Sequence, residues 1–243
     1  MNYIRYLLVC VALLTVTSVS FPMTGDKDSS AYLPDLLPRD LEMELALSAA
    51  PAHLRAEATV YVLQRGGYVK AQEGSNGFTC IVLRNVLRDE LILDQRIFVP
   101  VCYDRSYANA LLQKFLDTAS YIEEGLDKDE IRGRIAEGFR LGKYKPMQGV
   151  AISYMLSPIL AVPDGRGGIF RFIPHIMIGG SYLTDKDLGS RHELSGYLPW
   201  VQGAGEFGKP HGNIIFPVGE KERGEIAKAY ATLIAQMEEY INR

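Results

Sequence analysis

The sequence predicts an α+β fold, in which a largely antiparallel β-sheet packs against three or four helices, including an amphipathic C-terminal helix. The expected strands and helices come in clusters and do not alternate strictly, which favours antiparallel pairing. The chain of 243 residues is 47% hydrophobic and 23% charged, which is typical of a globular protein with a substantial core. We expect a single folded domain over residues 40–243.

The first twenty residues have the layout of a secretory signal peptide. Arg5 is their only charged residue, an apolar run covers Tyr6–Val16, and small residues precede a cleavage site after Ser20. The apolar run is short for a membrane span, although an uncleaved anchor is the alternative. We therefore expect export to the periplasm or beyond, with no stable membrane span after cleavage.

The segment after the expected cleavage site is polar and rich in proline. Residues 21–39 are therefore predicted to form a flexible tether with little fixed structure. Asp40 is placed to cap a short helix over Leu41–Ala50, which ends before Pro51 because proline restricts the residue that precedes it.

A β-rich block follows. Its β-branched and aromatic runs are separated by glycine-rich turns, and Gly66-Gly67 is predicted to form a two-residue hairpin turn. Pro100 cannot donate to a ladder, so its strand is expected at an edge or a bulge. The strands are expected at Ala58–Gln64, Tyr68–Gln72, Phe78–Arg84 and Arg96–Asp104.

Two helices are predicted next. Asp104 or Ser106 caps the first of them. The second begins at a capping box formed by Asp127 and Glu130, and Gly142 ends it.

Strands resume over Gly149–Ser157 and Gly168–Gly180. A long irregular stretch then covers residues 181–212, before a last strand at Asn213–Gly219. The chain closes with a helix from Glu220 to Arg243, because its apolar residues recur at helical spacing.

Two cysteines lie on expected strands. Cys80 shares a strand face with Phe78 and Val82, and Cys102 shares one with Phe98, so both point toward the core. An exported protein meets an oxidising compartment, and a Cys80–Cys102 disulfide is the favoured interpretation. Buried free thiols are one alternative. A functional thiol is another, although a reactive thiolate needs a partly exposed, electropositive setting.

Stretches from Leu47 to Gly219 carry a family resemblance. They read LSAAPAHLRAEATVYVLQRGGYVKAQEGSNGFTCIVLR, CYD, YMLSP and PHIM…YLTDKDLG…PHGNIIFPVG. They resemble an uncharacterised family of exported bacterial proteins with no assigned activity. The resemblance includes no catalytic signature, so it implies export and a single domain but no functional residues.

Signatures of known chemistry are weak or missing. Gly203–Gly208 matches G-x-G-x-x-G, but Pro199 precedes it and Pro210 follows it, so the strand and helix of a dinucleotide site are not expected. The sequence has no G-x-S-x-G, S-x-x-K or H-E-x-x-H motif of the hydrolases.

Three of the four histidines fall in or near the long irregular stretch. His175, His192 and His211 could meet Asp185 or Asp187 if that stretch folds over the end of the sheet. Neutral imidazoles with a carboxylate suit a transition metal, or a His–carboxylate general base. The alternative function is therefore a metal-dependent or His/carboxylate hydrolase.

Aromatic residues gather in the same stretch: Tyr182, Tyr197, Trp200 and Phe207. Long loops often carry binding function, and aromatic side chains make good contact surfaces, although these rings could equally pin the loop to the core. The leading hypothesis is a non-catalytic envelope or extracellular binding domain with its ligand surface in residues 181–212.

The same hypothesis sets the expected partners. They are a small molecule or an envelope protein, and the protein is expected to be a monomer. The net charge of −3 gives no indication of a nucleic-acid partner. No cofactor is predicted beyond the metal of the alternative, and a purely structural role is a third hypothesis.

Overall fold

A computed structural model of the chain describes residues 33–87, 90–145, 147, 149–164, 166–180, 182–190, 198–202 and 212–242. The bounds of the strands are β1 (Thr59–Gln64), β2 (Gly67–Gln72), β3 (Thr79–Leu83), β4 (Val86–Leu87), β5 (Glu90–Leu91), β6 (Val99–Tyr103), β7 (Ala151–Met155), β8 (Ala161–Pro163), β9 (Ile169–Arg171), β10 (His175–Gly180), β11 (Trp200–Val201) and β12 (Gly212–Pro217).

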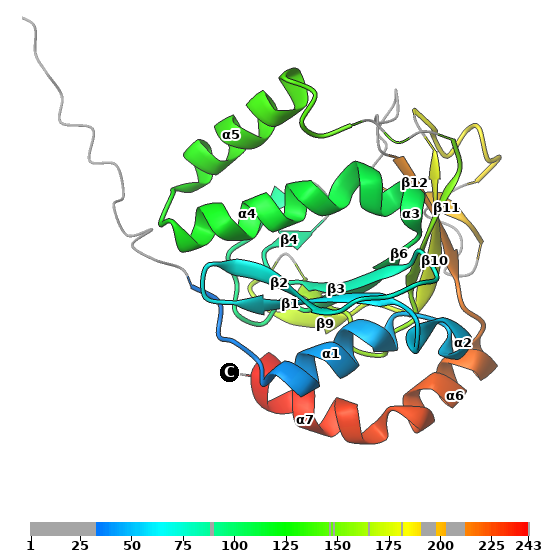
Figure 1. The fold of residues 1–243 in the computed structure, drawn as a ribbon. Coiled ribbons are helices and arrows are strands. Elements are labelled where there is room, and N and C mark those ends of the chain that lie inside the picture. The colour runs from blue at the N-terminus through cyan, green and yellow to red at the C-terminus, as the bar shows by residue number, and fades with distance from the viewer. Residues whose placement is uncertain are drawn as a thin grey trace, which may run out of the picture. The chain divides into compact units, whose positions relative to one another are not determined.

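One large sheet organises these strands. It has eight strands in the order β11-β12-β10-β7-β6-β3-β1-β2, while β4–β5 and β8–β9 form separate two-stranded ribbons (Figure 1). Every neighbouring pair in the large sheet is antiparallel except β1 and β3, which run parallel. The predicted α+β fold with a largely antiparallel sheet is confirmed.

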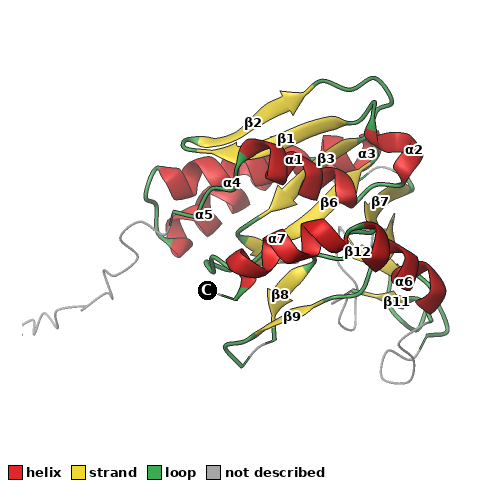
Figure 2. Cartoon of the chain, turned by 90° about the horizontal axis from the view of Figure 1, so that it is seen from below, coloured by secondary structure: helices red, strands yellow, loops and turns green. Residues whose placement is uncertain are grey.

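Helices cover both faces of the sheet. The helix α1 lies with the C-terminal helices on one side, α4 lies on the other, and α5 packs outside α4 (Figures 1 and 2). The bounds are α1 (Arg39–Ser48), α2 (Ala52–Arg55), α3 (Arg105–Tyr107), α4 (Gln113–Glu123), α5 (Lys128–Arg140), α6 (Glu220–Ala229) and α7 (Ala231–Ile241), with a π-helical turn, Ala108–Leu112, between α3 and α4.

Each face of the sheet has its own core. On the α1 and α7 side, Leu45, Leu233 and Met237 are fully buried with Val60 and Val82 of the strands. On the opposite side, the core is built from residues of the strands and of the α3–α4 segment, among them Ile81, Tyr103, Tyr107, Phe115, Met177 and Ile215. Within the described ranges, no helix is long and apolar enough to cross a membrane.

The cysteine pair lies in the first of these cores. Cys80 of β3 and Cys102 of β6 are directly opposite each other in the antiparallel ladder. Their sulfur atoms are 2.14 Å apart, the distance of a disulfide, and both residues are fully buried. The two cysteines are therefore at disulfide distance, and both point inward as expected.

Several sequence-predicted boundaries match the structure. Asp104 caps α3 by accepting the backbone N–H of Tyr107, and Asp127 with Glu130 forms the expected capping box of α5. Gly142 has a φ of +72° just after that helix, a conformation that suits glycine.

Two turn and edge expectations are wrong. The loop of the β1–β2 hairpin is Arg65-Gly66, and Gly67 is already the first residue of β2, paired with Gln64. A Cβ atom at Gly67 would lie 2.8 Å from the Ser120 hydroxyl, so α4 packs closely there. The strand of Pro100 is interior, but β7 pairs only with its last two residues, so no β7 residue opposes Pro100.

The C-terminal helix is also different from its prediction. The expected single helix, Glu220–Arg243, is divided at Tyr230, which has φ −110° and ψ 24°. The division accompanies a change in packing, because α7 buries Leu233, Met237 and Ile241 while α6 buries none of its residues. Tyr230 therefore lies where the exposed helix α6 ends and the core-packing helix α7 begins.

The end of the predicted tether is held in place. Residues 33–38 have no regular secondary structure, but the Gln95 side chain accepts the N–H of Asp35 and donates to the carbonyl of Leu33. Arg84 donates to the carbonyl of Asp35. The predicted signal peptide, residues 1–20, and the tether up to residue 32 lie outside the described residues.

Candidate functional site

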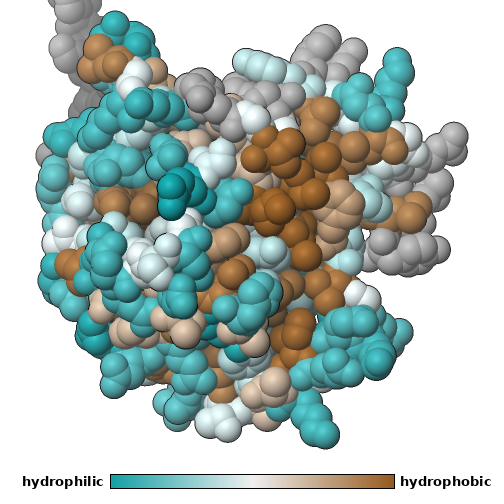
Figure 3. Space-filling view, turned by 45° about the vertical axis from the view of Figure 1, so that its right-hand side comes forward, coloured by the Kyte–Doolittle hydropathy of each residue, from teal (hydrophilic) through white to brown (hydrophobic). Residues whose placement is uncertain are grey.

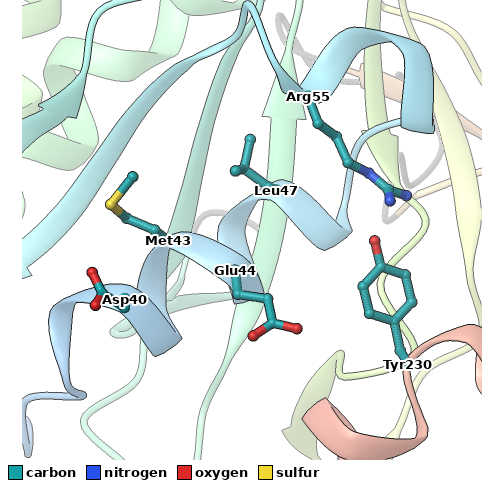
Figure 4. Close-up of a pocket in the computed structure, with 6 residues that line it drawn as sticks. All are labelled: Asp40, Met43, Glu44, Leu47, Arg55 and Tyr230. Atoms are coloured by element: carbon teal, nitrogen blue, oxygen red, sulfur yellow. The ribbon is translucent and has the colours of Figure 1, made fainter.

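A pocket of about 480 Å³ opens beside α1. We call it the α1 pocket. Its lining comes from the outer side of α1, from α2 and from the junction between α6 and α7 (Figure 4). The lining residues are Asp40, Met43, Glu44, Leu47, Arg55 and Tyr230.

The helix α1 supplies four of the six lining residues, two of them apolar and two of them acidic. Its inner side buries Glu42, Leu45, Ala46 and Ser48 against the sheet. Positions 40, 43, 44 and 47 recur at intervals of three and four, so their side chains lie along one outward stripe of the helix. Met43 and Leu47 are half-buried there, whereas Asp40 and Glu44 are exposed.

Arg55 is the cation of the pocket. Its Nε atom donates to the carbonyl of Ala50 at 2.9 Å, which holds the guanidinium group in position. Its guanidinium carbon lies 5.2 Å from the centre of the Tyr230 ring, within cation–π range. The two terminal nitrogens have no hydrogen-bond or ion-pair partner among the described residues, so their donors are available to a ligand.

Tyr230 forms the wall opposite Leu47. It is half-buried at the junction of α6 and α7, and its hydroxyl points toward Arg55 (Figure 4). Burial raises the pKa of Tyr230, Arg55 lowers it, and Glu44 raises it further. The phenol is therefore protonated at neutral pH and can donate a hydrogen bond beside the guanidinium.

The pocket combines apolar side chains with groups of both charges. The apolar side chains of Met43 and Leu47 lie along α1 between Asp40 at one end of the pocket and Arg55 with Tyr230 at the other, and Glu44 extends from the middle of the stripe toward Tyr230 (Figure 4). Pockets of this size with an apolar floor and a few polar groups are typical of small-ligand sites.

His175, a candidate ligand and general base, is in the core. It is 2% exposed, its Nδ1 atom lies 2.8 Å from the carbonyl oxygen of Ile173, and its ring meets Phe172 edge-on. Burial lowers the pKa of His175 to about 4, against the effect of the Ile173 hydrogen bond. The imidazole is therefore neutral at physiological pH.

The other two histidines of the predicted metal site, His192 and His211, lie outside the described residues. Among the residues that the structure does describe, no three His, Cys, Asp or Glu side chains are grouped so that they could hold a metal ion. The metal prediction accordingly gains no support from the described part of the chain.

The two candidate carboxylates shape the loop after β10. Asp185 accepts the backbone N–H of Val201 at 2.7 Å, and thereby ties the loop to β11. Asp187 accepts both the N–H and the hydroxyl of Thr184, and these hydrogen bonds lower the pKa of Asp187. Both side chains therefore have local structural partners.

The two described aromatic residues of the predicted binding surface differ in exposure. Tyr182 is 64% exposed and has a φ of +59°, an uncommon conformation for a residue with a side chain. Trp200 is 9% exposed and packs against Phe172 in the core. Tyr197 and Phe207 lie outside the described residues, so a ligand surface in residues 181–212 stays a prediction.

A second apolar surface lies on the sheet itself. Half-buried side chains of β7, β10 and β12 are paired across the strands on one face, and Figure 3, which brings this end of the sheet forward, shows hydrophobic residues gathered there. The residues that share this face are Ile152, Tyr154, Ile176, Ile178, Ile214 and Phe216.

Sequence reasoning missed the α1 pocket. A signal existed, because Met43 and Leu47 are apolar at a spacing of four, beside the stripe of Leu45, Ala46 and Ala49. Both pack against the same core but are only half-buried, so the apolar face of α1 extends from the core to the surface. Tyr230 gave no such signal, since it fits the apolar period of the C-terminal helix.

Comparison with known proteins adds no relative. No protein-family model, no curated protein and no solved structure matches the chain. The resemblance to a family of exported bacterial proteins thus stays a prediction, and the functional argument depends on the geometry of the chain itself.

Proposed function

We propose that the protein is an exported, non-catalytic binding domain that holds a small ligand in the α1 pocket. The observation that carries the proposal is the Arg55 guanidinium, whose terminal nitrogens have no partner among the described residues and which lies beside a protonated Tyr230 hydroxyl at the end of an apolar floor. A cation with free donors in a concave, partly apolar site is a favourable place for an anionic group.

Export is supported by the N-terminal sequence and by the cysteine pair. Residues 1–20 have the charge, apolar run and small residues of a signal peptide, and Cys80 and Cys102 lie at disulfide distance. Intact-mass spectrometry of the protein from its envelope or secreted fraction, without reductant, tests this. A chain that begins at Phe21 and is short by two hydrogens is expected, whereas a full-length mass from the cytosol would contradict export.

Binding in the pocket is tested with a variant that fills it. Leu47→Trp places a large ring over the floor, on the half-buried outer side of α1. A library of small anionic and amphipathic fragments is screened by ligand-observed NMR against the wild type and this variant. We expect fragments that bind the wild type and are lost with Leu47→Trp.

The matched control is Ala227→Trp, which adds the same ring at an exposed position of α6 outside the pocket lining. Fragments should bind this variant as they bind the wild type. A screen in which no fragment distinguishes Leu47→Trp from Ala227→Trp would rule out the α1 pocket as the binding site.

A further inference from the structure

We propose that the ligand of the α1 pocket is the carboxyl-terminal end of a short peptide that carries a basic side chain two residues before its terminus. This rests on the proposed function, because it names the ligand class of the same site. Three features of the pocket support it: an anion site at one end, an apolar floor, and two carboxylates along the α1 stripe, Glu44 in its middle and Asp40 at its other end.

The anion site fits a terminal carboxylate. The terminal nitrogens of Arg55 carry four N–H donors in one plane, and none has a partner among the described residues. A carboxylate accepts two parallel hydrogen bonds from such a planar group, and the Tyr230 hydroxyl can donate a third from beside it. The Ala50 carbonyl holds Arg55 through Nε, which leaves its outer edge free.

The floor of the pocket fits an apolar side chain next to that carboxylate. Leu47 is the lining residue of α1 closest in sequence to the Arg55 end, and Met43 lies one helical turn before it. Methionine is flexible and polarizable, so it adapts to side chains of different shape. The floor therefore favours an apolar residue at the peptide terminus without strict shape selection.

The carboxylates of the α1 stripe fit a cation. Glu44 and Asp40 are exposed, lie one turn apart on the same stripe, and have no ion-pair partner among the described residues. Two carboxylates one helical turn apart attract a lysine or arginine side chain, with modest strength because the groups are solvated.

Length decides between a peptide and a single amino acid. Seven residues of helix separate Asp40 from Leu47, which corresponds to about 10 Å along α1. Three extended peptide residues span about 10 Å, whereas a single residue spans only about a third of that distance. A tripeptide therefore matches the length of the α1 stripe between Leu47 and Asp40, whereas a single amino acid does not.

The test uses three probe peptides with the exported protein. They are acetyl-Lys-Ala-Leu with a free carboxylate, the same peptide with a C-terminal amide, and the same peptide with acetylated lysine. Binding is measured from the shift of the Met43 methyl NMR signal, assigned with Met43→Leu, so that only events at the pocket are counted. We expect the acid peptide to bind at least tenfold more tightly than the amide.

Two variants identify the contacts. Arg55→Met should weaken the acid peptide at least tenfold and make acid and amide equal. Glu44→Gln should weaken the lysine peptide severalfold but leave the acetyl-lysine peptide unchanged. Arg166→Met and Glu239→Gln, which change exposed residues outside the pocket lining, should leave all three affinities unchanged. Because Glu44 is exposed and has no partner among the described residues, its variant tests the proposal even if Arg55→Met does not fold.

The outcomes separate the two proposals. Equal binding of acid and amide, or an acid peptide that does not shift Met43 while fragments sensitive to Leu47→Trp do, would overturn the peptide ligand and leave the proposed binding function standing. If neither peptides nor fragments perturb Met43, both proposals are wrong.

Discussion

The side-chain carboxylate of Glu42 accepts the backbone N–H of Leu63 at 2.9 Å. Strand β1 pairs with β3 only at Thr59 and Val60, so Glu42 of α1 takes the place of a strand neighbour near the end of β1. Its Oε2 atom is buried and has no hydrogen-bond partner among the described residues. Burial raises the pKa of Glu42 to about 7, although the Leu63 hydrogen bond and the charge of Arg84 both lower it.

The first prediction concerns the protonation of Glu42. Its pKa is higher in the folded chain than its ordinary value of 4.5, so its stabilising contribution is present below pH 4.5 and is lost as pH rises through 7. The difference corresponds to about 3 kcal/mol, since one unit of pKa is about 1.4 kcal/mol. Between pH 4 and pH 8, the free energy of unfolding of the wild type should fall by about 3 kcal/mol relative to Glu42→Gln.

Urea unfolding at a series of pH values measures this difference. Glu239→Gln, an exposed carboxylate of α7 for which no ion pair is described, is the control and should run parallel to the wild type. Parallel curves for the wild type and Glu42→Gln would contradict the raised pKa of Glu42. They would show that the carboxyl group of the folded chain is ionised across this pH range, or that water reaches it.

The second prediction concerns His175 and has the opposite sign. Burial lowers the pKa of His175 from 6.5 to about 4, so the folded chain binds fewer protons than the unfolded chain between these values. Its stabilising contribution is therefore present above pH 6.5 and is lost as pH falls toward 4, again by about 3 kcal/mol. An NMR titration should show the His175 ring neutral at pH 5, and a ring that titrates near 6.5 would contradict its burial.

Together the two groups make stability less dependent on pH than either alone. Between pH 4.5 and 6.5, Glu42 binds more protons in the folded chain than in the unfolded chain, so rising pH destabilises the fold through this group. His175 binds more protons in the unfolded chain, so rising pH stabilises the fold through this second group. In this window, His175→Gln should reveal a fall in stability with rising pH, and Glu42→Gln should reveal a rise.

The third prediction concerns the cysteine pair. The two residues are 22 positions apart, and the chain-entropy model gives a crosslink of that length about 3 kcal/mol. The double variant Cys80→Ala, Cys102→Ala should lose stability of that order in urea. Reductant should lower the midpoint of the wild type and leave that of the double variant unchanged. A wild type whose midpoint stays the same after complete reduction would show that the crosslink does not stabilise the fold.

The sequence predicted those features that depend on local pattern. The capping box at Asp127 and Glu130, the cap at Asp104 and the inward direction of Cys80 each follow from a few neighbouring residues. The antiparallel character of the sheet followed from the clustering of strands. The caps and the direction of Cys80 are decided within about ten residues of chain, the range in which periodicity and capping rules operate.

Two of the features that it missed depend on contacts between distant segments. Glu42 occupies a core position although glutamate is rarely buried, because β1 and β3 diverge and leave an N–H that needs an acceptor. The division of the last helix at Tyr230, and with it the wall of the α1 pocket, depends on where α7 meets the core. Neither is encoded in a local pattern, so the pocket could not be assembled from the sequence.

The last prediction compares two glycines of the same helix. Alanine is favoured over glycine in a helix by about 1 kcal/mol, so Gly→Ala should stabilise α5 wherever space allows. Gly133 is exposed, and a Cβ atom there would meet nothing within 4 Å. Gly138 is buried, and a Cβ atom there would overlap with the ring of Tyr144.

The surroundings of Tyr144 prevent it from moving aside. Its ring is 2% exposed, contacts Phe139 edge-on, and its hydroxyl donates to Asp117 of α4 at 2.7 Å. Gly138→Ala should therefore destabilise the protein by about 1–3 kcal/mol, the usual cost of overpacking, while Gly133→Ala should stabilise it by up to about 1 kcal/mol. Thermal unfolding should show shifts of opposite sign, of about 2–4 °C per kcal/mol for a chain of this length. Stabilisation by both substitutions would mean that Tyr144 does not pack on α5.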